Sequence, residues 1–420
     1  MKLKILSAII ISLISQYSVA EENTESVNQE VPVEVLKNFI DVYHVVKNNY
    51  VDPVDSEKLI TDAMKGMVSN LDPHSQFLDK SERDALMNGI SGEFAGIGVE
   101  LQVVDGGLKV IAPIESTPAQ RAGIRSGDII IKINDKMLAT LSSPSEGFKL
   151  LKGQPGERVE LLIVRDKQQL KFEITKEIIK VKTTKSKIVD GRFGYVKINI
   201  FQKDTGLELY DSINNLNKQK ALEGLILDLR GNPGGLLDEA VNVSDLFLDE
   251  AVVTYTKDRN NDKKYYKARD GQIIRNLPLV VLIDGGSASA SEIVAGALQD
   301  HKRAIVIGSR SFGKGSVQNI IEFSNGNALK LTTARYYTPK GRSIQATGIE
   351  PDVTINAISA KSNKTIYRVS EKDLNGHISN DTKIEKQKTV EKNIEIVDPE
   401  KDYFLYEAIN TLKIMGLSKK

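Results

Sequence analysis

The sequence predicts an α+β multidomain protein, in which an α/β core carries an inserted β-rich segment and has helical segments at both ends. The chain has 420 residues, which is more than one hydrophobic core usually holds. Short strand patterns with turn residues fill 91–178, whereas apolar strands alternate with amphipathic helices over 179–355. The predicted division of the chain is therefore 1–20, 21–90, 91–178, 179–355 and 356–420.

The first twenty residues have the pattern of a secretory signal peptide. Lys2 and Lys4 precede a mostly apolar run over 5–14, and small residues follow at Ser18 and Ala20. Because spanning a bilayer takes about 18 or more apolar residues, this run is too short for a comfortable membrane span. We expect a cleaved signal peptide and a periplasmic protein; an uncleaved leader would make it membrane-associated.

Composition excludes several classes of function. Lys and Arg total 57 while Asp and Glu total 56, so the bulk charge does not favour a nucleic-acid partner. The absence of cysteine excludes disulfides, thiol catalysis and thiolate metal sites. No metal site is expected, because the histidines lack paired ligand spacing and are interpreted as ordinary ones: His44, His74, His301 and His377.

Amphipathic helices are predicted near both ends. Apolar residues recur at helical spacing over 35–50, over 55–70 and over 403–415. For the first two helices, packing onto the body of the chain is favoured over a contact between subunits. The sequence leaves both arrangements open for the last helix. A polar stretch at 358–398 precedes that helix and is expected to be loosely ordered.

The β-rich segment, from Gly92 to about Ile178, contains three short motifs in a fixed order. They are Gly96-Ile97-Gly98-Val99, then Ser116-Thr117-Pro118-Ala119 with Ala122-Gly123-Ile124, and then Gly127-Asp128-Ile129-Ile130. Together they resemble a PDZ domain of the bacterial kind. This resemblance implies a groove that takes up a peptide as an added strand, with backbone N–H groups of the first motif binding a terminal carboxylate.

Two details of the first motif qualify this prediction. Gly96 and Gly98 let a carboxylate approach the backbone closely, although glycines at this spacing can also serve only to permit a turn. The apolar residues Ile97 and Val99 suggest, as a hypothesis, a preference for apolar C-terminal residues. The expected partners are therefore proteins with accessible, apolar C-termini.

The core segment alternates strand and helix patterns. Predicted strands cover 195–200, 225–229, 279–283, 304–307 and 329–333, and predicted helices cover 207–216, 236–247 and 293–298. The small residues of 285–291 form a sharp turn between a buried strand and a helix. Such a turn can present the hydroxyl of Ser289.

Three interpretations compete for this central stretch. The sequence from Gly308 to Lys314 has the spacing of a phosphate-binding loop, but Gly315 stands where that loop requires Ser or Thr. Ser289 and Glu292 fit a capping box, in which the serine only caps a helix. A third interpretation makes Ser289 a nucleophile. A continuous helix would place His301 about 18 Å along its axis from Ser289, so a lysine remains as the base.

Four motifs together resemble the carboxyl-terminal processing proteases, also called tail-specific proteases. The motifs are Gly286 to Glu292, Phe312 to Gly315 with Gln318, Asp228 to Gly235, and Leu329 to Tyr337. The resemblance covers roughly 35–353, with the PDZ segment inserted in the expected place. It implies a crotonase/Clp-like α/β core and a serine endopeptidase with a Ser-Lys dyad that needs no cofactor.

The resemblance also assigns roles by position in these motifs. It implies Ser289 as the nucleophile, Lys314 as the general base and Gln318 as the residue that orients the lysine amine. The backbone N–H groups of Gly235 and Ala290 would form the oxyanion hole. A lysine is a base only when neutral, so its pKa must lie well below the usual value of about 10.4.

The resulting prediction is an exported serine endopeptidase that recognises protein C-termini through its PDZ domain. The resemblance implies that the position of this domain gates the active site. An activating adaptor and a homo-oligomer formed through the terminal helices are further candidate partners. The alternative is a catalytically inactive PDZ scaffold that binds C-termini, and nucleotide hydrolysis ranks third.

Overall fold

The computed structural model describes residues 32–141, 144–270, 274–355, 370–373, 375–377 and 402–417. The predicted signal peptide and most of the polar stretch at 358–398 lie outside these residues. The chain forms two compact units, one ending at Ala63 and the other beginning at Met64.

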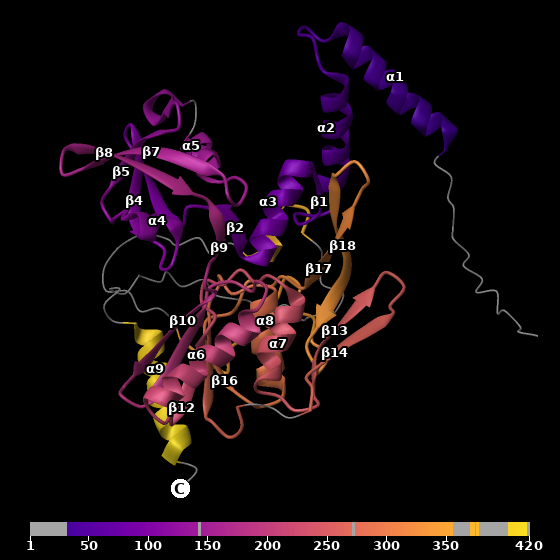
Figure 1. Cartoon of the computed structure of the whole chain (residues 1–420). Coiled ribbons are helices and arrows are strands. Elements are labelled where there is room, and N and C mark those ends of the chain that lie inside the picture. The colour runs from indigo at the N-terminus through magenta and orange to yellow at the C-terminus, as the bar shows by residue number, and fades with distance from the viewer. Residues whose placement is uncertain are drawn as a thin grey trace, which may run out of the picture. The chain divides into compact units, whose positions relative to one another are not determined.

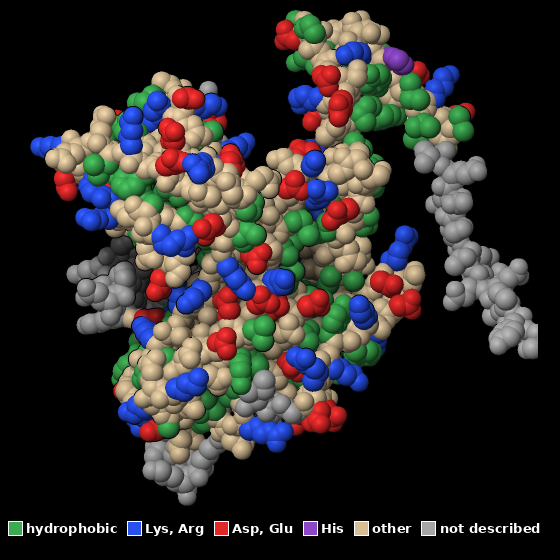
Figure 2. Space-filling model, in the orientation of Figure 1, with side chains coloured by type: hydrophobic (Ala, Val, Ile, Leu, Met, Phe, Trp, Pro, Cys, Tyr) green, Lys and Arg blue, Asp and Glu red, His purple; other side chains and the backbone are tan. Residues whose placement is uncertain are grey.

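The N-terminal unit consists of helices. Helix α1 spans Val33–Asn49, and the unit ends within α2, which spans Ser56–Ser69. Both helices were predicted from apolar spacing, and the structure confirms them. No residue of α1 is buried, and hydrophobic side chains gather along its surface (Figure 2).

A six-stranded sheet forms the centre of the larger unit. Its order is β10-β11-β12-β15-β16-β19, and every neighbouring pair is parallel except β10 with β11. The strands are β10 (Thr184–Val189), β11 (Phe193–Ile198), β12 (Gly224–Asp228), β15 (Leu279–Ile283), β16 (Ile305–Gly308) and β19 (Val353–Thr354). The central strands β12 and β15 are buried throughout, as expected for parallel strands covered on both faces.

Helices cover both faces of this sheet (Figure 1). One face carries α6 (Thr205–Gln219), α7 (Leu237–Asp245) and α8 (Ala290–Asp300). The other face carries α9 (Tyr403–Leu417), which buries Ala408 and Leu412 against the strands. The last helix, whose placement the sequence left open, therefore docks on its own chain.

A second sheet lies beside the first, and of its strands only β18 was predicted, over 329–333. Its path is β1-β18-β13-β14, and β17 pairs with β18. The strands are β1 (Gln76–Leu78), β13 (Val252–Asp258), β14 (Lys263–Lys267), β17 (Ser316–Glu322) and β18 (Ala328–Tyr337). Helix α3 (Lys80–Ser91) follows β1 and starts at a capping box between Asp79 and Glu82. The loop that carries Lys314 connects β16 of the first sheet to β17 of the second.

The β-rich segment is inserted through a pair of antiparallel strands, β2 (Glu93–Gly96) and β9 (Glu177–Lys180). Between them lie β3 (Val99–Val104), β4 (Gly107–Pro113), β5 (Ile129–Ile133), β6 (Lys136–Met137), β7 (Arg158–Arg165) and β8 (Gln168–Thr175), with helices α4 (Pro118–Ala122) and α5 (Pro144–Leu151). The segment has its own hydrophobic core, in which Val110, Ile130 and Ile163 are fully buried. The structure confirms the predicted α+β multidomain class.

Candidate active site

A tight turn presents Ser289 between β15 and α8, as the sequence predicted. The turn is held by Ser287, whose hydroxyl accepts from the Asp284 amide at 2.9 Å and donates to the Leu229 carbonyl at 2.8 Å. Ser289 is the residue that precedes α8, and its φ is 54°. A positive φ in a residue other than glycine costs about 1–3 kcal/mol, so the surroundings must impose this conformation.

The Glu292 carboxylate connects Ser289 to the loop that carries Lys314. Its Oε2 accepts from the backbone amides of Ser289 at 2.8 Å and Lys314 at 2.9 Å. Its Oε1 accepts from the Ser311 hydroxyl at 2.5 Å and the Gly313 amide at 2.8 Å. Since two amides share one oxygen, the nitrogens of Ser289 and Lys314 lie within two hydrogen-bond lengths of each other.

Glu292 thus acts as more than a helix cap. It reaches back to the Ser289 amide as a capping box requires, and it also fixes the lysine loop. Burial raises the pKa of Glu292 to about 7, whereas the four donated hydrogen bonds favour its ionised form. Sequence reasoning identified the cap but not the connection between the two motifs.

The environment of Lys314 suits a base. Burial and the neighbouring Lys330 lower its pKa to about 8, against the opposing effects of Glu371, Glu292 and Asp72. Desolvation disfavours the charged ammonium, which is the condition that a lysine base must meet.

The side chains of the predicted dyad and of Gln318 are not joined. Among the described residues, no hydrogen bond connects Lys314 to Ser289 Oγ or to Gln318. The Gln318 amide nitrogen instead donates to the hydroxyls of Ser316 at 3.0 Å and Thr332 at 3.1 Å. The structure therefore brings Ser289 and Lys314 together through the backbone, while Gln318 is engaged within β17 and β18.

Tyr336 is a site residue to which the sequence assigned no role. Its hydroxyl donates to the Lys314 carbonyl, and burial raises its pKa, which a hydrogen bond with the Ser289 side chain opposes. Tyr336 lies in β18, within one of the four motifs named above. The sequence could have indicated Tyr336 only through this motif, since no other residue of the motif had been given a role.

The predicted oxyanion-hole residues, Gly235 and Ala290, each adjoin the position of Ser289 along or across the chain: Ala290 follows Ser289, and Gly235 follows Gly234, which packs against Ser289. A side chain on Gly234 would come within 2.7 Å of the Ser289 Cβ and 2.9 Å of the Ala290 nitrogen. Gly235 has φ +144°, and a Cβ there would lie 2.0 Å from the Phe201 carbonyl oxygen. Gly234 thus permits the turn to pack directly against the start of α8, where the Ala290 amide belongs to the first helical turn, while Gly235 permits it to pack against Phe201.

Residues distant in sequence complete the surroundings of the Lys314 loop. His74 Nε2 lies 2.8 Å from each carboxylate oxygen of Glu371, and Glu371 is 0% exposed. Burial opposes ionisation of Asp72, but hydrogen bonds from the Ser75 hydroxyl and from the amides of His74 and Ser75 outweigh it and lower the pKa of Asp72. The interpretation of His74 as an ordinary histidine missed this placement.

The expectation of loose order over 358–398 is wrong at Glu371. This residue lies in a short 3-10 turn, Glu371–Asp373, and its side chain is completely buried. Nothing in the polar composition of this stretch distinguishes Glu371 from the neighbouring charged residues, because its partners come from distant parts of the chain.

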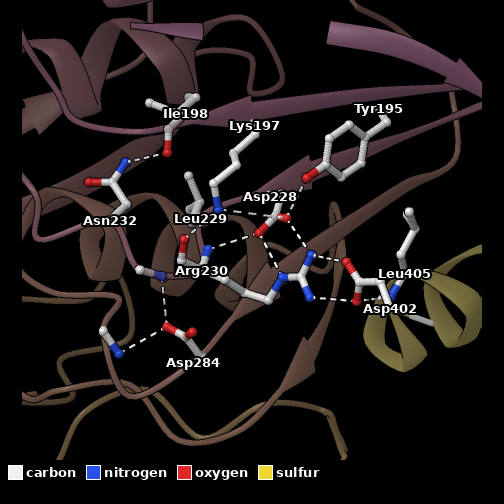
Figure 3. A network of polar contacts seen from close by, with 12 residues as sticks. Tyr195, Lys197, Ile198, Asp228, Leu229, Arg230, Asn232, Asp284, Asp402 and Leu405 are labelled. Carbon is white, nitrogen blue, oxygen red and sulfur yellow. Dashed lines mark hydrogen bonds and ion pairs between the residues drawn. The ribbon is translucent and has the colours of Figure 1, made fainter. Parts of the chain in front are cut away.

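A cluster of polar side chains lies next to the turn that contains Gly234 and Gly235 (Figure 3). Arg230 donates to both carboxylate oxygens of the buried Asp228, at 2.9 and 2.6 Å, and to both of Asp402, at 2.7 Å each. Tyr195 also donates to Asp228, at 2.7 Å. Asp402 accepts from the Leu405 amide at the start of α9, so Arg230 connects the last helix to the turn that begins at Gly231.

The predicted carboxylate loop lies in the β-rich segment. Gly98 has φ +80°, and a Cβ there would lie 2.4 Å from Thr117 Cβ, so the position requires glycine. A groove of about 1350 Å³ is lined by Ile97, Gly98 and Val99 together with residues of α3 and α5. Ile97 is only 1% exposed and belongs to the domain core. Gly96 of β2 pairs with Glu177 of β9.

Within the described ranges of the chain, no cluster of three or more His, Asp or Glu side chains could hold a metal ion. None of the helices described above is long and apolar enough to cross a membrane.

Comparisons with known proteins give consistent matches. Family models match for peptidase family S41 over residues 192–355, for a PDZ domain over 95–175, and for the activating protease CtpB N-terminal domain over 9–82. A carboxy-terminal-processing protease of Bartonella bacilliformis is 41% identical over 359 residues, which cover 84% of this chain and 82% of that protein.

Two further relatives are more distant. A probable CtpA-like serine protease of Staphylococcus aureus is 36% identical over 348 residues, covering 81% of this chain and 70% of its own length. The solved structure of a photosystem II D1 C-terminal processing protease is 29% identical, with a TM-score of 0.45, and covers 77% of this chain and 93% of its own.

Proposed function

Because this chain belongs to peptidase family S41 and to its carboxy-terminal-processing proteases, we propose that it is an exported endopeptidase that cleaves with a Ser289–Lys314 dyad. We further propose that the PDZ domain selects substrates by their C-termini. The observation that supports the dyad best is the shared Glu292 oxygen, which holds the backbone amides of both residues.

The first chemical step forms an ester with the enzyme. Neutral Lys314 takes the proton of the Ser289 hydroxyl as the oxygen attacks the peptide carbonyl. Negative charge then develops on the carbonyl oxygen, which the amides of Gly235 and Ala290 would stabilise. The intermediate collapses as the carbon–nitrogen bond breaks, and the Lys314 ammonium donates its proton to the leaving amine.

The second step releases the product. Lys314, neutral again, accepts a proton from a water molecule that attacks the acyl carbonyl, and it returns the proton to Ser289 when the ester bond breaks. Each proton taken up by the lysine is thus given back within the same half-reaction. A pKa near 8 suits both directions of transfer at mildly alkaline pH.

The resting arrangement supports control by substrate. No hydrogen bond joins the side chains of Ser289, Lys314 and Gln318 among the described residues, and Gln318 is engaged with Ser316 and Thr332. In the proposal, occupation of the PDZ groove releases Gln318 to orient the lysine amine. Catalytic hydrogen bonds are often loose without substrate, so this geometry is compatible with the dyad.

One experiment tests the cleavage chemistry. The purified protein is incubated without ATP and with a chelator, together with a poorly folded substrate that ends in apolar residues. The same assay is run with Ser289→Ala and Lys314→Ala variants. We expect cleavage by the wild type and losses of at least about 10³-fold in both variants.

The outcomes separate the alternatives. Binding of the substrate without cleavage would support a PDZ scaffold in place of an enzyme. Cleavage that persists in both variants would retain the protease and reject this dyad. For the export proposal, cell fractionation and N-terminal sequencing of the mature protein show whether the leader is removed and whether the protein reaches the periplasm.

A further inference from the structure

Four consecutive residues of the lysine loop, 312–315, are held by three buried residues, through the side chains of Glu292 and Gln345 and the backbone amide of Glu371. Glu292 binds the amides of Gly313 and Lys314. The Phe312 carbonyl accepts from the Glu371 amide at 3.4 Å. We propose that Glu371 is a positioning residue, through which the C-terminal part of the chain holds the Lys314 loop in its catalytic place. This inference rests on the proposed function.

The Glu371 side chain is fixed from two directions. His74 Nε2 lies 2.8 Å from both carboxylate oxygens, and Gln345 Nε2 donates to Oε1 at 3.1 Å. The carboxylate is 0% exposed, although the flanking residues Ser370 and Asp373 reach solvent. A buried charge is costly unless its partners are well placed, so these contacts must be specific.

Gln345 passes this restraint on to the lysine loop. Its Oε1 accepts from the Gly315 amide at 2.7 Å, while its Nε2 donates to Glu371. Gly315 must be a glycine here, because a Cβ would lie 2.8 Å from the backbone nitrogen of Gln345. Glu371 therefore contacts both ends of the loop: its backbone amide binds Phe312, and its side chain acts through Gln345 at Gly315.

Glu371 also places a negative charge near the lysine amine. Its charge raises the pKa of Lys314, in the same direction as Glu292 and Asp72 and against burial and Lys330. The protonatable His74 adjoins it. The residue thus has two separable effects: its hydrogen bonds position the loop, and its charge favours the protonated lysine.

The test compares three single variants in the full-length protein. Glu371→Ala removes the side-chain hydrogen bonds and the charge but keeps the backbone bond to Phe312. Glu371→Gln removes the charge and keeps an oxygen that can accept from His74 and Gln345. Asp373→Asn is the matched control, because this exposed carboxylate lies in the same turn and accepts from the Ser370 amide and hydroxyl. The readouts are kcat, the pH dependence of kcat/KM, and the amide hydrogen exchange of residues 312–315.

We expect Glu371→Ala to lower kcat by about 10- to 100-fold and to speed exchange at 313–315, because a displaced base costs about this much. Glu371→Gln should restore most of kcat, while its pH profile moves to lower pH because Lys314 loses a favourable negative charge. Asp373→Asn should match the wild type in every readout.

Two results would overturn the inference. One is an unchanged kcat and pH profile in Glu371→Ala. The other is a rise in activity of that variant, which would show that the turn Glu371–Asp373 inhibits the active site. If the wild type cleaves nothing, the proposed function fails, but the exchange of 312–315 still reports whether Glu371 restrains the loop. The two failures are therefore distinguishable.

Discussion

At the residue scale, the two proposed catalytic residues are brought together through their backbones. Glu292 Oε2 receives both amides, and the Tyr336 hydroxyl lies between the Ser289 side chain and the Lys314 carbonyl. Neither contact involves the lysine amine, which leaves that group free to change partners. The pair can thus be rigid in its main chain and adaptable in its reacting atoms.

The lysine base makes a pH-dependent prediction. Because the pKa of Lys314 is lowered to about 8, the neutral fraction grows as the pH rises through that value. We expect kcat/KM to increase roughly tenfold per unit below pH 8 and to level off above it. Initial rates with a short peptide in buffers of constant ionic strength measure this profile. A profile that is flat from pH 6 to 9 would exclude Lys314 as the base.

The same lysine should reduce stability. Its pKa falls from 10.5 in the unfolded chain to about 8 in the folded one, so the folded state binds the proton less well. The resulting loss in the free energy of unfolding is complete below pH 8 and disappears as the pH approaches 10.5. Lys314→Met should therefore abolish activity and, at pH 7, raise the free energy of unfolding by about 1 kcal/mol, a figure reduced for partial solvent access.

Urea unfolding of this variant and the wild type at pH 7 and pH 10 checks the sign. The difference in stability should shrink at the higher pH, because the wild-type lysine then carries less charge. Equal free energies of unfolding for Lys314→Met and the wild type at pH 7 would contradict the burial of the Lys314 amine.

Sequence reasoning found the residues whose motifs are local and missed those defined by distant contacts. Ser289 and Lys314 each stand in a short glycine-rich stretch, so their types and spacing were informative. His74 and Glu371 meet across 297 positions of the chain, and no local pattern marks either of them. Gln318 was named from its motif, but only the structure shows its present partners.

At the element scale, the last helix is joined to the catalytic turn. Arg230 binds Asp228 at the end of β12 and Asp402 at the start of α9, and these ion pairs raise its pKa against the effect of burial. Asp228 is completely buried, whereas the Asp402 side chain is 35% exposed. The two carboxylates should therefore respond differently when the arginine is lost.

We predict unequal costs for the members of this cluster. Arg230→Leu removes the two-bond arginine partner of the buried Asp228 and leaves it the longer ion pair with Lys197, at 3.9 Å, so it should lower the free energy of unfolding by about 3–5 kcal/mol. Asp402→Asn removes a partly exposed charge and should cost about 1 kcal/mol or less. Chemical denaturation at pH 7 measures both. Similar costs for the two variants would show that Asp228 does not depend on Arg230.

The elements that were predicted share one property, and the missed ones share another. Strands such as β15 are continuous apolar runs because both faces are buried, so they are visible in the sequence. Strands β13 and β14 mix lysines with aromatic or β-branched residues, and β17 carries Gln, Asn and Glu, so none of them is a continuous apolar run. Their pairing with β18 is set by contacts that no short window contains.

At the scale of the whole molecule, the hydrophobic cores are separate. One core lies under α6, α7 and α8, another lies under α9, and a third is made entirely of residues of the β-rich segment. The third core is connected to the rest through the β2 and β9 pair. The β-rich domain should therefore unfold without unfolding the core sheet.

A core substitution tests this independence. Ile130 is 0% exposed in the β-rich core, so Ile130→Ala should destabilise that domain by about 2–5 kcal/mol. Amide exchange should quicken over 97–175 and stay unchanged in β12 and β15. The matched control, Val281→Ala, should act on the core sheet and leave the β-rich domain protected. Faster exchange of both regions in either variant would indicate one cooperative unit.

The docking of α9 has a consequence for the order of folding. This helix covers the face of the sheet formed by β12, β15 and β16, yet it is synthesised after all of them. Until α9 has been made, the apolar residues of that face remain uncovered. The nascent chain must therefore expose an apolar surface from the synthesis of β12 until that of α9.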